Sequence, residues 1–455
     1  TELLEPLTGE RRVVVGPLLR GSAEELFCDA RNLESLLRLG RARAAVTGEP
    51  VPLERLSWIL ACRQGLVRPP KSGAEAVVST LETLACLSLP AELWEQEVLP
   101  ARVPGYDPHW LDRALFDAGM SWVGRPDRRL AFLLEGDLAL LAASPESTTT
   151  PSLVPTAGAR YTFRDLQSQH HLPADQLAKG LWEEAWQGRT ANDGFAALRG
   201  AQTVGFRFPT FDPGVHRGRR GRRPEAPGCF AGHWYRVETN TGGEGDAVDR
   251  EELSRDRVRL LLDRYGVLCR PLLEREEPAL RWSSLFRSIR LMELSGELIS
   301  GTFLADLPGP QFTIPALLPL LSTDQAEEVF WLSAVDPASL CGVDLPLPVR
   351  LPRRTTTTHL VYRGWSLALV SRRYGRVLEI TLPPDHPDLG KCCGVLQHLL
   401  SRPLRPLRRI CVEEINGAPA TTSPYLSVLR AGFDTWVEGE EVILHRKRPG
   451  GPVAR

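Results

Sequence analysis

Lysine is scarce in this sequence of 455 residues: only four of its 55 basic residues are lysines. Almost every positive charge is therefore carried by a planar guanidinium, which can contact a phosphate through two parallel hydrogen bonds. A GC-rich genome produces the same bias, so the bias alone assigns no function. The formal net charge is −1. Since no field of the whole protein attracts DNA or anionic lipid, electrostatic binding must come from local patches.

Paired cysteines and long apolar runs are also missing. The nine cysteines form no CxxC pair, and the adjacent Cys392 and Cys393 suit neither a zinc site nor a disulfide. This usage is typical of a reducing compartment, so we expect a cytoplasmic protein. No signal peptide is recognisable and no apolar run approaches membrane-spanning length. We therefore expect no membrane partner.

The motifs of several enzyme classes are absent as well. The only Gly-Lys pair, Gly390-Lys391, is followed by cysteine and lacks the glycine frame of a phosphate-binding loop. There is no GxSxG, HExxH or GxGxxG motif. The adjacent His170 and His171 would point in different directions on a helix and would not form a metal pair. We expect neither ATPase nor helicase activity from this chain alone, and no cofactor or metal.

The order of elements indicates winged-helix domains, in which helices are followed by a β-hairpin. A chain of this length predicts two to four domains. One such domain is expected over 51–145, with helices at 56–62, 74–84, 89–99 and 108–118 and strands at 121–123, 130–134 and 138–141. A second is expected over 251–321, with helices at 252–265, 271–276 and 279–294, and a hairpin formed by 297–303 and 311–314. Gly296 should cap the last of these helices.

The remaining segments complete an α+β fold of tandem winged-helix modules and a small β-rich, barrel-like C-terminal domain. We expect a remnant of an upstream winged helix at 1–50, a helical or winged-helix module at 161–203, a basic irregular segment at 204–250 and the β-rich domain at 322–446. The first block should contain a helix over 23–39. Trp182 and Trp186, four residues apart, indicate a core face more than a stacking platform. The chain is expected to be a fragment, or a stand-alone relative, of something longer.

Candidate nucleic-acid contacts fall in two places. The third helix of a winged helix commonly enters the major groove, so Arg281, Ser284, Arg287 and Arg290 are candidates, with Ser283 and Ser288 as further phosphate donors. A Gly-interspersed basic run adds Arg217, Arg219, Arg220, Arg222 and Arg223. The helix residues are equally well explained as a solvated outer face of the helix, and the basic run is equally well explained as a solubilising loop.

A collinear set of short segments carries a resemblance, and it includes Glu25–Leu36, Leu89-Pro90, Leu99–Val103, Tyr106–Pro108, Trp122–Gly124, Leu181-Trp182, Trp186–Gly188, Asn192-Asp193, Leu198-Arg199, Leu262–Val267, Val335–Ala338 and Leu429–Phe433. In this order they resemble the C-terminal region of large helicase-related (Lhr) proteins. The resemblance covers nearly the whole chain and implies tandem winged helices, a β-barrel-like unit, a role in DNA repair and self-association. In that family a helicase motor precedes this region. The implied partners are therefore DNA, single-stranded or duplex, further copies of the chain, and a helicase motor in cis or in trans.

The same region is similar to winged-helix DNA glycosylases of the AlkZ and YcaQ type. Those enzymes carry a Gln-x-Gln or Gln-x-Asp motif where this chain has 84–88, Leu-Ala-Cys-Leu-Ser, without glutamine or carboxylate. Neither Ala85 nor Ser88 can replace a carboxylate, so we expect little or no base excision.

Three functions stay open: a DNA-binding and oligomerisation region, a glycosylase for uracil or alkylated bases that acts by base flipping, and a protein-binding scaffold. A glycosylase would need a carboxylate such as Asp107 or Asp434, with Asp112 and Glu441 as further candidates. Asp107, however, precedes Pro108 in the manner of a helix N-cap. A scaffold would show an apolar face on the third helix in place of an arginine-bearing one.

Overall fold

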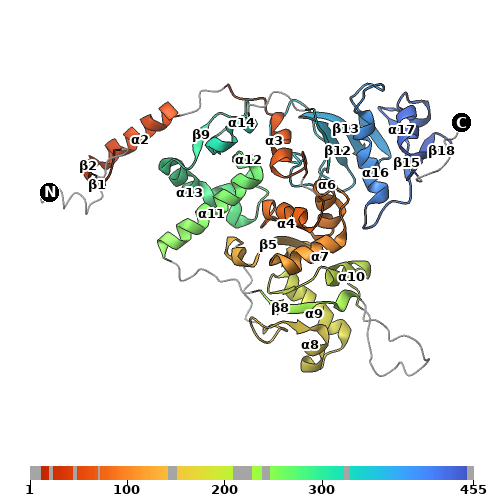
Figure 1. The fold of residues 1–455 in the computed structure, drawn as a ribbon, viewed down its shortest axis with the longest axis horizontal. Coiled ribbons are helices and arrows are strands. Elements are labelled where there is room, and N and C mark those ends of the chain that lie inside the picture. Colours follow the sequence, from red (N-terminus) through yellow and green to blue (C-terminus); the bar gives the residue numbers. More distant parts are fainter. Residues whose placement is uncertain are drawn as a thin grey trace.

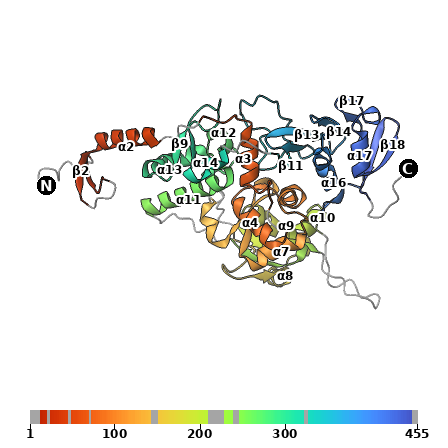
Figure 2. The same ribbon diagram turned by 45° about the horizontal axis from the view of Figure 1, so that its top comes forward.

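The structure is a computed structural model, and it describes residues 12–19, 24–44, 49–69, 72–141, 151–208, 228–237, 246–321 and 327–447. The molecule is elongated (Figure 1), with the N-terminal elements at one end and the C-terminal sheet at the other. The winged-helix domains lie between them. The same arrangement is visible after a turn of 45° about the horizontal axis (Figure 2).

The N-terminal elements form an arm that projects from the body (Figure 1). The arm consists of β1 (Val13–Gly16), β2 (Leu26–Asp29) and α2 (Ala30–Ala44). The carboxylate of Asp29 accepts hydrogen bonds from the backbone N–H groups of Arg31 and Asn32, which caps the start of α2. The expected helix over 23–39 is therefore wrong in its first turns, where the chain pairs as a strand with β1.

The first winged helix follows the short helix α3 (Arg55–Arg63). Its elements are α4 (Ala74–Thr83), β3 (Leu89–Pro90), α5 (Ala91–Leu93), the π-helix η1 (Trp94–Val98), α6 (Leu99–Arg102), α7 (Pro108–Asp117), β4 (Met120–Arg125), the 3₁₀ turn η2 (Pro126–Arg128) and β5 (Arg129–Leu134). The strands pair antiparallel in the order β3-β5-β4, and the turn between β4 and β5 is the wing. The strand expected at 138–141 is wrong, because this stretch belongs to the 3₁₀ helix η3 (Glu135–Leu140).

A middle module packs against the first winged helix. It contains β6 (Tyr161–Thr162), α8 (Phe163–His170), α9 (Ala174–Trp186), β7 (Thr190–Asn192), α10 (Ala196–Thr203), η4 (Gly228–Phe230) and β8 (His233–Arg236), with strand order β6-β8-β7. Its helix α9 lies so close to β4 that a Cβ atom on Gly124 would stand 2.1 Å from the carbonyl oxygen of Ala185. Trp182 stacks on Trp122 with ring centroids 6.1 Å apart. The core interpretation of Trp182 and Trp186 is confirmed.

The second winged helix repeats the topology of the first. It contains α11 (Ala247–Tyr265), α12 (Arg270–Leu273), η5 (Pro278–Leu280), α13 (Trp282–Ser295), β9 (Ile299–Gly301) and β10 (Gln311–Thr313), followed by η6 (Pro315–Leu317) and α14 (Leu318–Leu321). Strand β10 pairs with β9 on one side. On its other side a single bridge between Leu268 and Phe312 takes the place of a third strand. Gly296 ends α13 with a left-handed backbone (φ 82°), as expected.

The C-terminal unit is an open sheet, which corrects the expectation of a barrel. Six strands run in the order β11-β12-β13-β14-β16-β17, and β15, β19 and β18 form a separate sheet of three. The strands are β11 (Val329–Ser333), β12 (His359–Arg363), β13 (Ser366–Arg372), β14 (Val377–Ile380), β15 (Ile410–Val412), β16 (Glu414–Ile415), β17 (Ala418–Pro419), β18 (Asp434–Glu438) and β19 (Glu441–His445). The helices are α15 (Leu389–Cys392), α16 (Gly394–Ser401), η7 (Ala420–Thr422) and α17 (Leu426–Gly432). Among the described strands, β11 and β17 end the larger sheet without pairing to one another.

A buried glutamate of the π-helix joins the first winged helix to the middle module. The carboxylate of Glu95 accepts hydrogen bonds from Arg199 at 2.8 Å and from the hydroxyl of Tyr106 at 2.7 Å. Arg199 belongs to α10, so this contact crosses between the two domains. Since Glu95 is only 2% exposed, removing Arg199 would leave the Glu95 charge buried without a counter-charge.

Glu97, two residues later, joins the same helix to the C-terminal unit. Its carboxylate accepts hydrogen bonds from Arg402 at 2.6 Å and from His359 at 3.0 Å, and His398 lies 3.4 Å away. At the end of α6, Arg102 donates to both carboxylate oxygens of Asp336, at 2.7 and 2.8 Å, and both side chains are fully buried. Residues 91–102 therefore fix the positions of three units relative to one another.

Candidate nucleic-acid interface

Helix α13 presents most of the candidate contacts on its exposed side. Arg281, Ser284, Arg287 and Arg290 are all exposed, whereas Ser288 is buried. Arg287 makes no hydrogen bond or ion pair with any residue that the structure describes. Arg290 pairs with Glu293 on the next turn, and the hydroxyl of Ser284 donates to the carbonyl of Pro278 at 2.7 Å. Arg287 is thus the most available cation of the predicted face.

Arg281 lies apart from that face, at the start of α13 and at the edge of a cleft. Its Nε donates to the carbonyl oxygen of Glu276 at 3.0 Å. The cleft has a volume of about 190 Å³ and lies between the segment before α13 and the wing of the first winged helix. Arg281 and Arg275 line it from one side, and Arg125 and Arg129 of the wing line it from the other. The fold therefore brings the basic wing of one domain to the start of α13 in the other.

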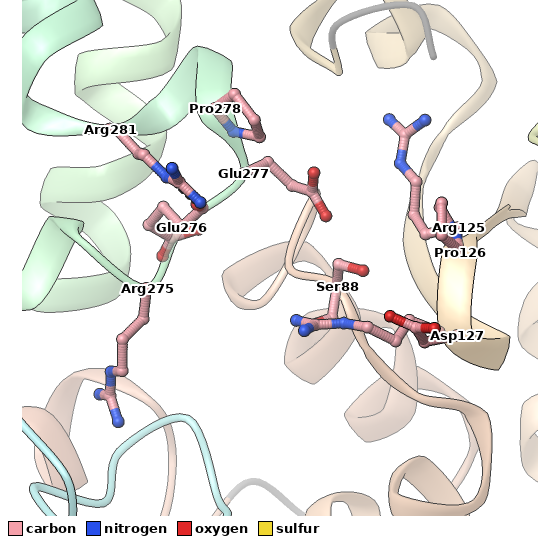
Figure 3. Close-up of a pocket in the computed structure, with 10 residues that line it drawn as sticks. Ser88, Arg125, Pro126, Asp127, Arg275, Glu276, Glu277, Pro278 and Arg281 are labelled. Atoms are coloured by element: carbon pink, nitrogen blue, oxygen red, sulfur yellow. Dashed lines mark hydrogen bonds between the residues drawn. The ribbon is translucent and has the colours of Figure 1, made fainter. Parts of the chain in front are cut away.

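The cleft also contains carboxylates and one buried hydroxyl (Figure 3). Glu277 extends from the segment before α13 toward Ser88, and Asp127 stands on the wing opposite. Ser88 is only 3% exposed, and its hydroxyl has no hydrogen-bond partner among the described residues. Burial lowers the pKa of the Arg125 guanidinium, and the negative charge of Glu277 opposes that shift. The cleft is therefore mixed in charge and not uniformly basic.

A second cleft, of about 440 Å³, adjoins the first and shares Ser88, Arg129, Arg275 and Arg281 with it. Arg354 of the C-terminal unit enters this cleft beside Arg275. Burial and, next in size, the neighbouring positive charge of Arg275 together lower the pKa of Arg354 to about 10. Both guanidinium groups are already bound by backbone carbonyl oxygens, because Arg354 donates to that of Val335 at 2.7 Å and Arg275 donates to that of Ser339 at 2.9 Å.

The other predicted residues lie outside these two clefts. Asp107 caps α7 by accepting from the backbone N–H of His109 at 2.8 Å, as expected for an N-cap. Asp112 is bound to Arg199 at 2.8 Å. Asp434 and Glu441 lie on β18 and β19 of the small C-terminal sheet. The run containing Arg217, Arg219, Arg220, Arg222 and Arg223 lies outside the described residues.

Sequence reasoning missed the wing arginines and Arg354. The signal in the sequence was the turn Arg125-Pro126-Asp127-Arg128-Arg129, which places three cations around one hairpin. Only the packing of the two winged helices shows that Arg125 and Arg129 face Arg281. No group of three or more His, Cys, Asp or Glu side chains within the described ranges could hold a metal ion. Among these residues, no helix is long and apolar enough to cross a bilayer.

The fold and the site define a class of protein: a string of winged-helix domains with arginines gathered where two of them meet. Residues 51–142 and 247–329 each match a family model described as large helicase-related protein, winged-helix domain. The predicted resemblance to the C-terminal region of Lhr proteins is confirmed.

Two curated relatives match most of the chain. It is 29% identical over 414 residues to the Lhr helicase/uracil glycosylase of Escherichia coli (strain K12), a match that covers 81% of this chain and 26% of that protein. It is 26% identical over 470 residues to the Lhr helicase/probable uracil glycosylase of Mycolicibacterium smegmatis (strain ATCC 700084 / mc(2)155), covering 95% of this chain and 30% of that protein. The chain therefore spans less than a third of the length of these relatives. Among solved structures, the DNA glycosylase AlkZ of Streptomyces sahachiroi aligns with a TM-score of 0.46 and 14% identity, over 77% of this chain and 96% of that one.

Proposed function

We propose that this chain is a DNA-binding region of an Lhr-type protein, without the ATP-driven motor. The single observation that supports this best is the convergence of arginines from two winged helices on one junction, beside the exposed arginine face of α13. Guanidinium groups at a winged-helix surface match the phosphates of a nucleic-acid backbone in geometry and charge. The arginine-bearing third helix favours nucleic acid over the protein-binding scaffold, which would need an apolar helix face.

The proposal includes two finer points that come from the resemblance. The chain is expected to self-associate, and its helicase motor partner acts in cis or in trans. A nucleoid location in the cytoplasm would follow from DNA binding.

The test is a titration of labelled DNA, single-stranded and duplex, at several salt concentrations. We expect micromolar or weaker affinity that falls steeply with salt, because bound phosphates release counterions. Affinity that stays constant from low to high salt would contradict the proposal. The same preparation should release no phosphate from ATP, with or without DNA, since the chain has no phosphate-binding loop.

A second candidate function is base excision in the junction cleft. The observation that favours it is the buried, unpartnered hydroxyl of Ser88, which faces Glu277 and Asp127 in the same cleft. A glycosylase needs a carboxylate to stabilise the cationic sugar or to position water. Glu277 and Asp127 line the junction cleft, whereas Asp107 and Asp434 lie outside it.

The test is the release of free uracil from uracil-containing DNA. If excision occurs at this site, Glu277→Gln or Asp127→Asn should abolish it, and Asp107→Asn should leave it unchanged. Release that none of these substitutions affects would exclude the junction cleft as its site.

A further inference from the structure

A third cleft, in the C-terminal unit, has a composition that neither winged helix shows. Its volume is about 480 Å³, and four arginines line it: Arg350, Arg353, Arg372 and Arg373. Three threonines, at positions 355, 357 and 358, add hydroxyl groups, and the remaining lining residues are Leu351 and Pro352. No carboxylate is among the described residues that line it, in contrast to the junction cleft with its Asp127 and Glu277. We call it the Arg/Thr cleft.

The cleft is built by two anchored segments. On one wall, Arg354 holds the chain in place by donating from its guanidinium to the carbonyl oxygen of Val335 at 2.7 Å. In extended chain, neighbouring side chains point to opposite sides, so Arg353 is directed away from that anchor. On the other wall, the turn between β13 and β14 docks through a hydrogen bond of 2.8 Å from the N–H of Tyr374 to the carbonyl oxygen of Thr357. Arg373 and Tyr374 adopt positive φ angles of 50° and 56° in this turn, a backbone conformation that is uncommon outside glycine.

The charges of the four arginines are not equally compensated. Arg372 makes two hydrogen bonds to Glu379, at 2.9 and 3.1 Å, and Arg373 pairs with Glu413 at 2.9 Å. Arg350 and Arg353 are exposed and make no hydrogen bond or ion pair with any described residue. The cleft therefore keeps two uncompensated guanidinium groups beside a row of threonine hydroxyls. Phosphate oxygens accept hydrogen bonds from both kinds of donor, whereas a carboxylate-bearing site would repel them.

The Arg/Thr cleft is separated from the winged-helix junction by one strip of chain. Arg354 and Thr356 of this strip line the second cleft, together with Arg275 and Arg281, while Arg353, Thr355 and Thr357 line the Arg/Thr cleft. Alternate residues of the same segment thus supply donors to both clefts. We propose that the Arg/Thr cleft binds backbone phosphates of the same nucleic-acid strand that α13 and the junction contact. The bound strand then extends from the second winged helix onto the C-terminal unit. This inference rests on the proposed DNA-binding function.

The experiment compares three double variants of the full chain. Arg350→Gln with Arg353→Gln removes the two uncompensated charges of the cleft. Arg430→Gln with Arg446→Gln removes two exposed arginines of the C-terminal unit that do not line it and serves as the matched control. Arg287→Ala with Arg290→Ala removes charge from α13. Circular dichroism and thermal melting check that each variant is folded, which is expected because all the changed side chains are exposed.

Each variant is titrated with labelled single-stranded and duplex DNA over a range of salt concentrations. The cleft variant should bind about ten-fold more weakly than wild type, and its slope of log affinity against log salt should fall by about 2 for duplex, since each lost phosphate contact contributes about 0.9. The control variant should keep both values. Isothermal titration with inorganic phosphate and with a mononucleotide measures whether the cleft instead holds a small free anion.

The outcomes separate this inference from the proposed function. If the α13 variant weakens binding and the cleft variant equals its control, the inference is wrong and the proposed function stands. If wild-type protein binds no DNA, both are wrong. If the cleft variant loses only inorganic phosphate or mononucleotide binding, the cleft is a small-anion site and not part of a strand-binding surface.

Discussion

The two winged helices of this chain share a topology but use it in different ways. Each places three short strands in the same order, and each positions a third helix, α7 or α13, before its hairpin. Helix α7 exposes Phe116, which is 86% accessible, and an Arg113 that is paired with Asp117 on its own helix at 3.2 Å. Helix α13 exposes Arg287, without a partner among the described residues. The single arginine of α7 is therefore paired on its own helix, whereas α13 has one paired arginine, Arg290 with Glu293, and one without a partner among the described residues, Arg287.

A second difference lies in the helix between the first strand and the third helix. In the first winged helix, residues 91–102 bear Glu95, Glu97 and Arg102, all buried and all bound to other units. In the second, the corresponding helix α12 has only four residues. The first winged helix is therefore held to two other units by buried ion pairs, whereas the second carries the exposed helix that we propose as the recognition surface. The predictions that follow test this division.

The largest effect is expected from Glu97→Ala, which removes the carboxylate that binds Arg402 and His359. Glu97 is 3% exposed, so its loss leaves the buried guanidinium of Arg402 without a counter-charge. Such a loss typically costs about 3–5 kcal/mol. The free energy of unfolding, measured with urea, should fall by roughly 3 kcal/mol or more.

The matched control is Glu92→Ala, five residues earlier in the same segment. Glu92 also pairs with the C-terminal unit, through Arg405 at 3.1 Å, but both side chains are about half exposed. Its loss should cost less than about 1 kcal/mol, as exposed pairs contribute little. Equal effects of the two substitutions would show that residues 91–102 do not act as the scaffold.

Acid should weaken the scaffold in a defined pH range. Burial raises the pKa of the Glu97 carboxyl, but hydrogen bonds from His359 and His398 outweigh burial and hold it at about 2, against an ordinary value of 4.5. A carboxyl group whose pKa is lower in the folded than in the unfolded state stabilises the fold at pH values above its unfolded-state pKa. This stabilisation is lost as the pH falls toward the folded-state pKa. We therefore expect up to about 3 kcal/mol of stability to disappear between roughly pH 5 and pH 2. In Glu97→Ala this contribution should be missing, and an unchanged acid slope in that variant would contradict the assignment.

Much of the fold could be predicted from the sequence, because local patterns determine it. Helical periodicity followed by paired short strands predicted both winged helices, and Gly296 gave the end of α13. The closure of a sheet depends on contacts between distant strands, so the open order from β11 to β17 could not be predicted from strand segments alone. The same holds for residues 26–29 at the start of the expected helix over 23–39, where pairing of β2 with β1 outweighs a helical pattern.

The candidate site was predictable only in part. Arg287 could be named from the sequence, because the third helix of a winged helix commonly enters the major groove. The positions of Arg125 and Arg129 in the cleft depend on how two domains pack together. The position of Arg353 depends on an irregular extended segment in which alternate side chains face opposite clefts. Contacts of that kind join residues far apart in the sequence, and no local pattern encodes them.

A smaller effect than the loss of stability in Glu97→Ala is expected for DNA binding, when α13 of the second winged helix is compared with α7 of the first. Arg287→Ala with Arg290→Ala should weaken binding on the order of ten-fold and reduce the salt slope, because these guanidinium groups are expected to contact phosphates. His109→Ala with Arg113→Ala on α7 is the matched change and should leave the affinity within about two-fold, since Arg113 is already compensated by Asp117. Fluorescence anisotropy at two salt concentrations measures both. If the α7 variant loses more affinity than the α13 variant, the assignment of scaffold and recognition surface must be exchanged.

The smallest effect is expected from Phe116→Ser on α7. Because Phe116 is 86% exposed, its replacement should change the free energy of unfolding by no more than about 0.5 kcal/mol. Phe286 on α13 is 38% exposed and lies 5.3 Å from the ring of Trp282, so Phe286→Ser should cost more, about 1 kcal/mol. An exposed aromatic ring that does little for folding is a candidate contact between copies, whereas the arginines of α13 would repel one another. Light scattering at tens of micromolar should therefore give a wild-type mass above the 50.4 kDa of one chain, and a lower mass for Phe116→Ser than for Phe286→Ser. A monomeric wild-type protein would contradict self-association, and an association that Phe116→Ser leaves intact would exclude α7 as its contact surface.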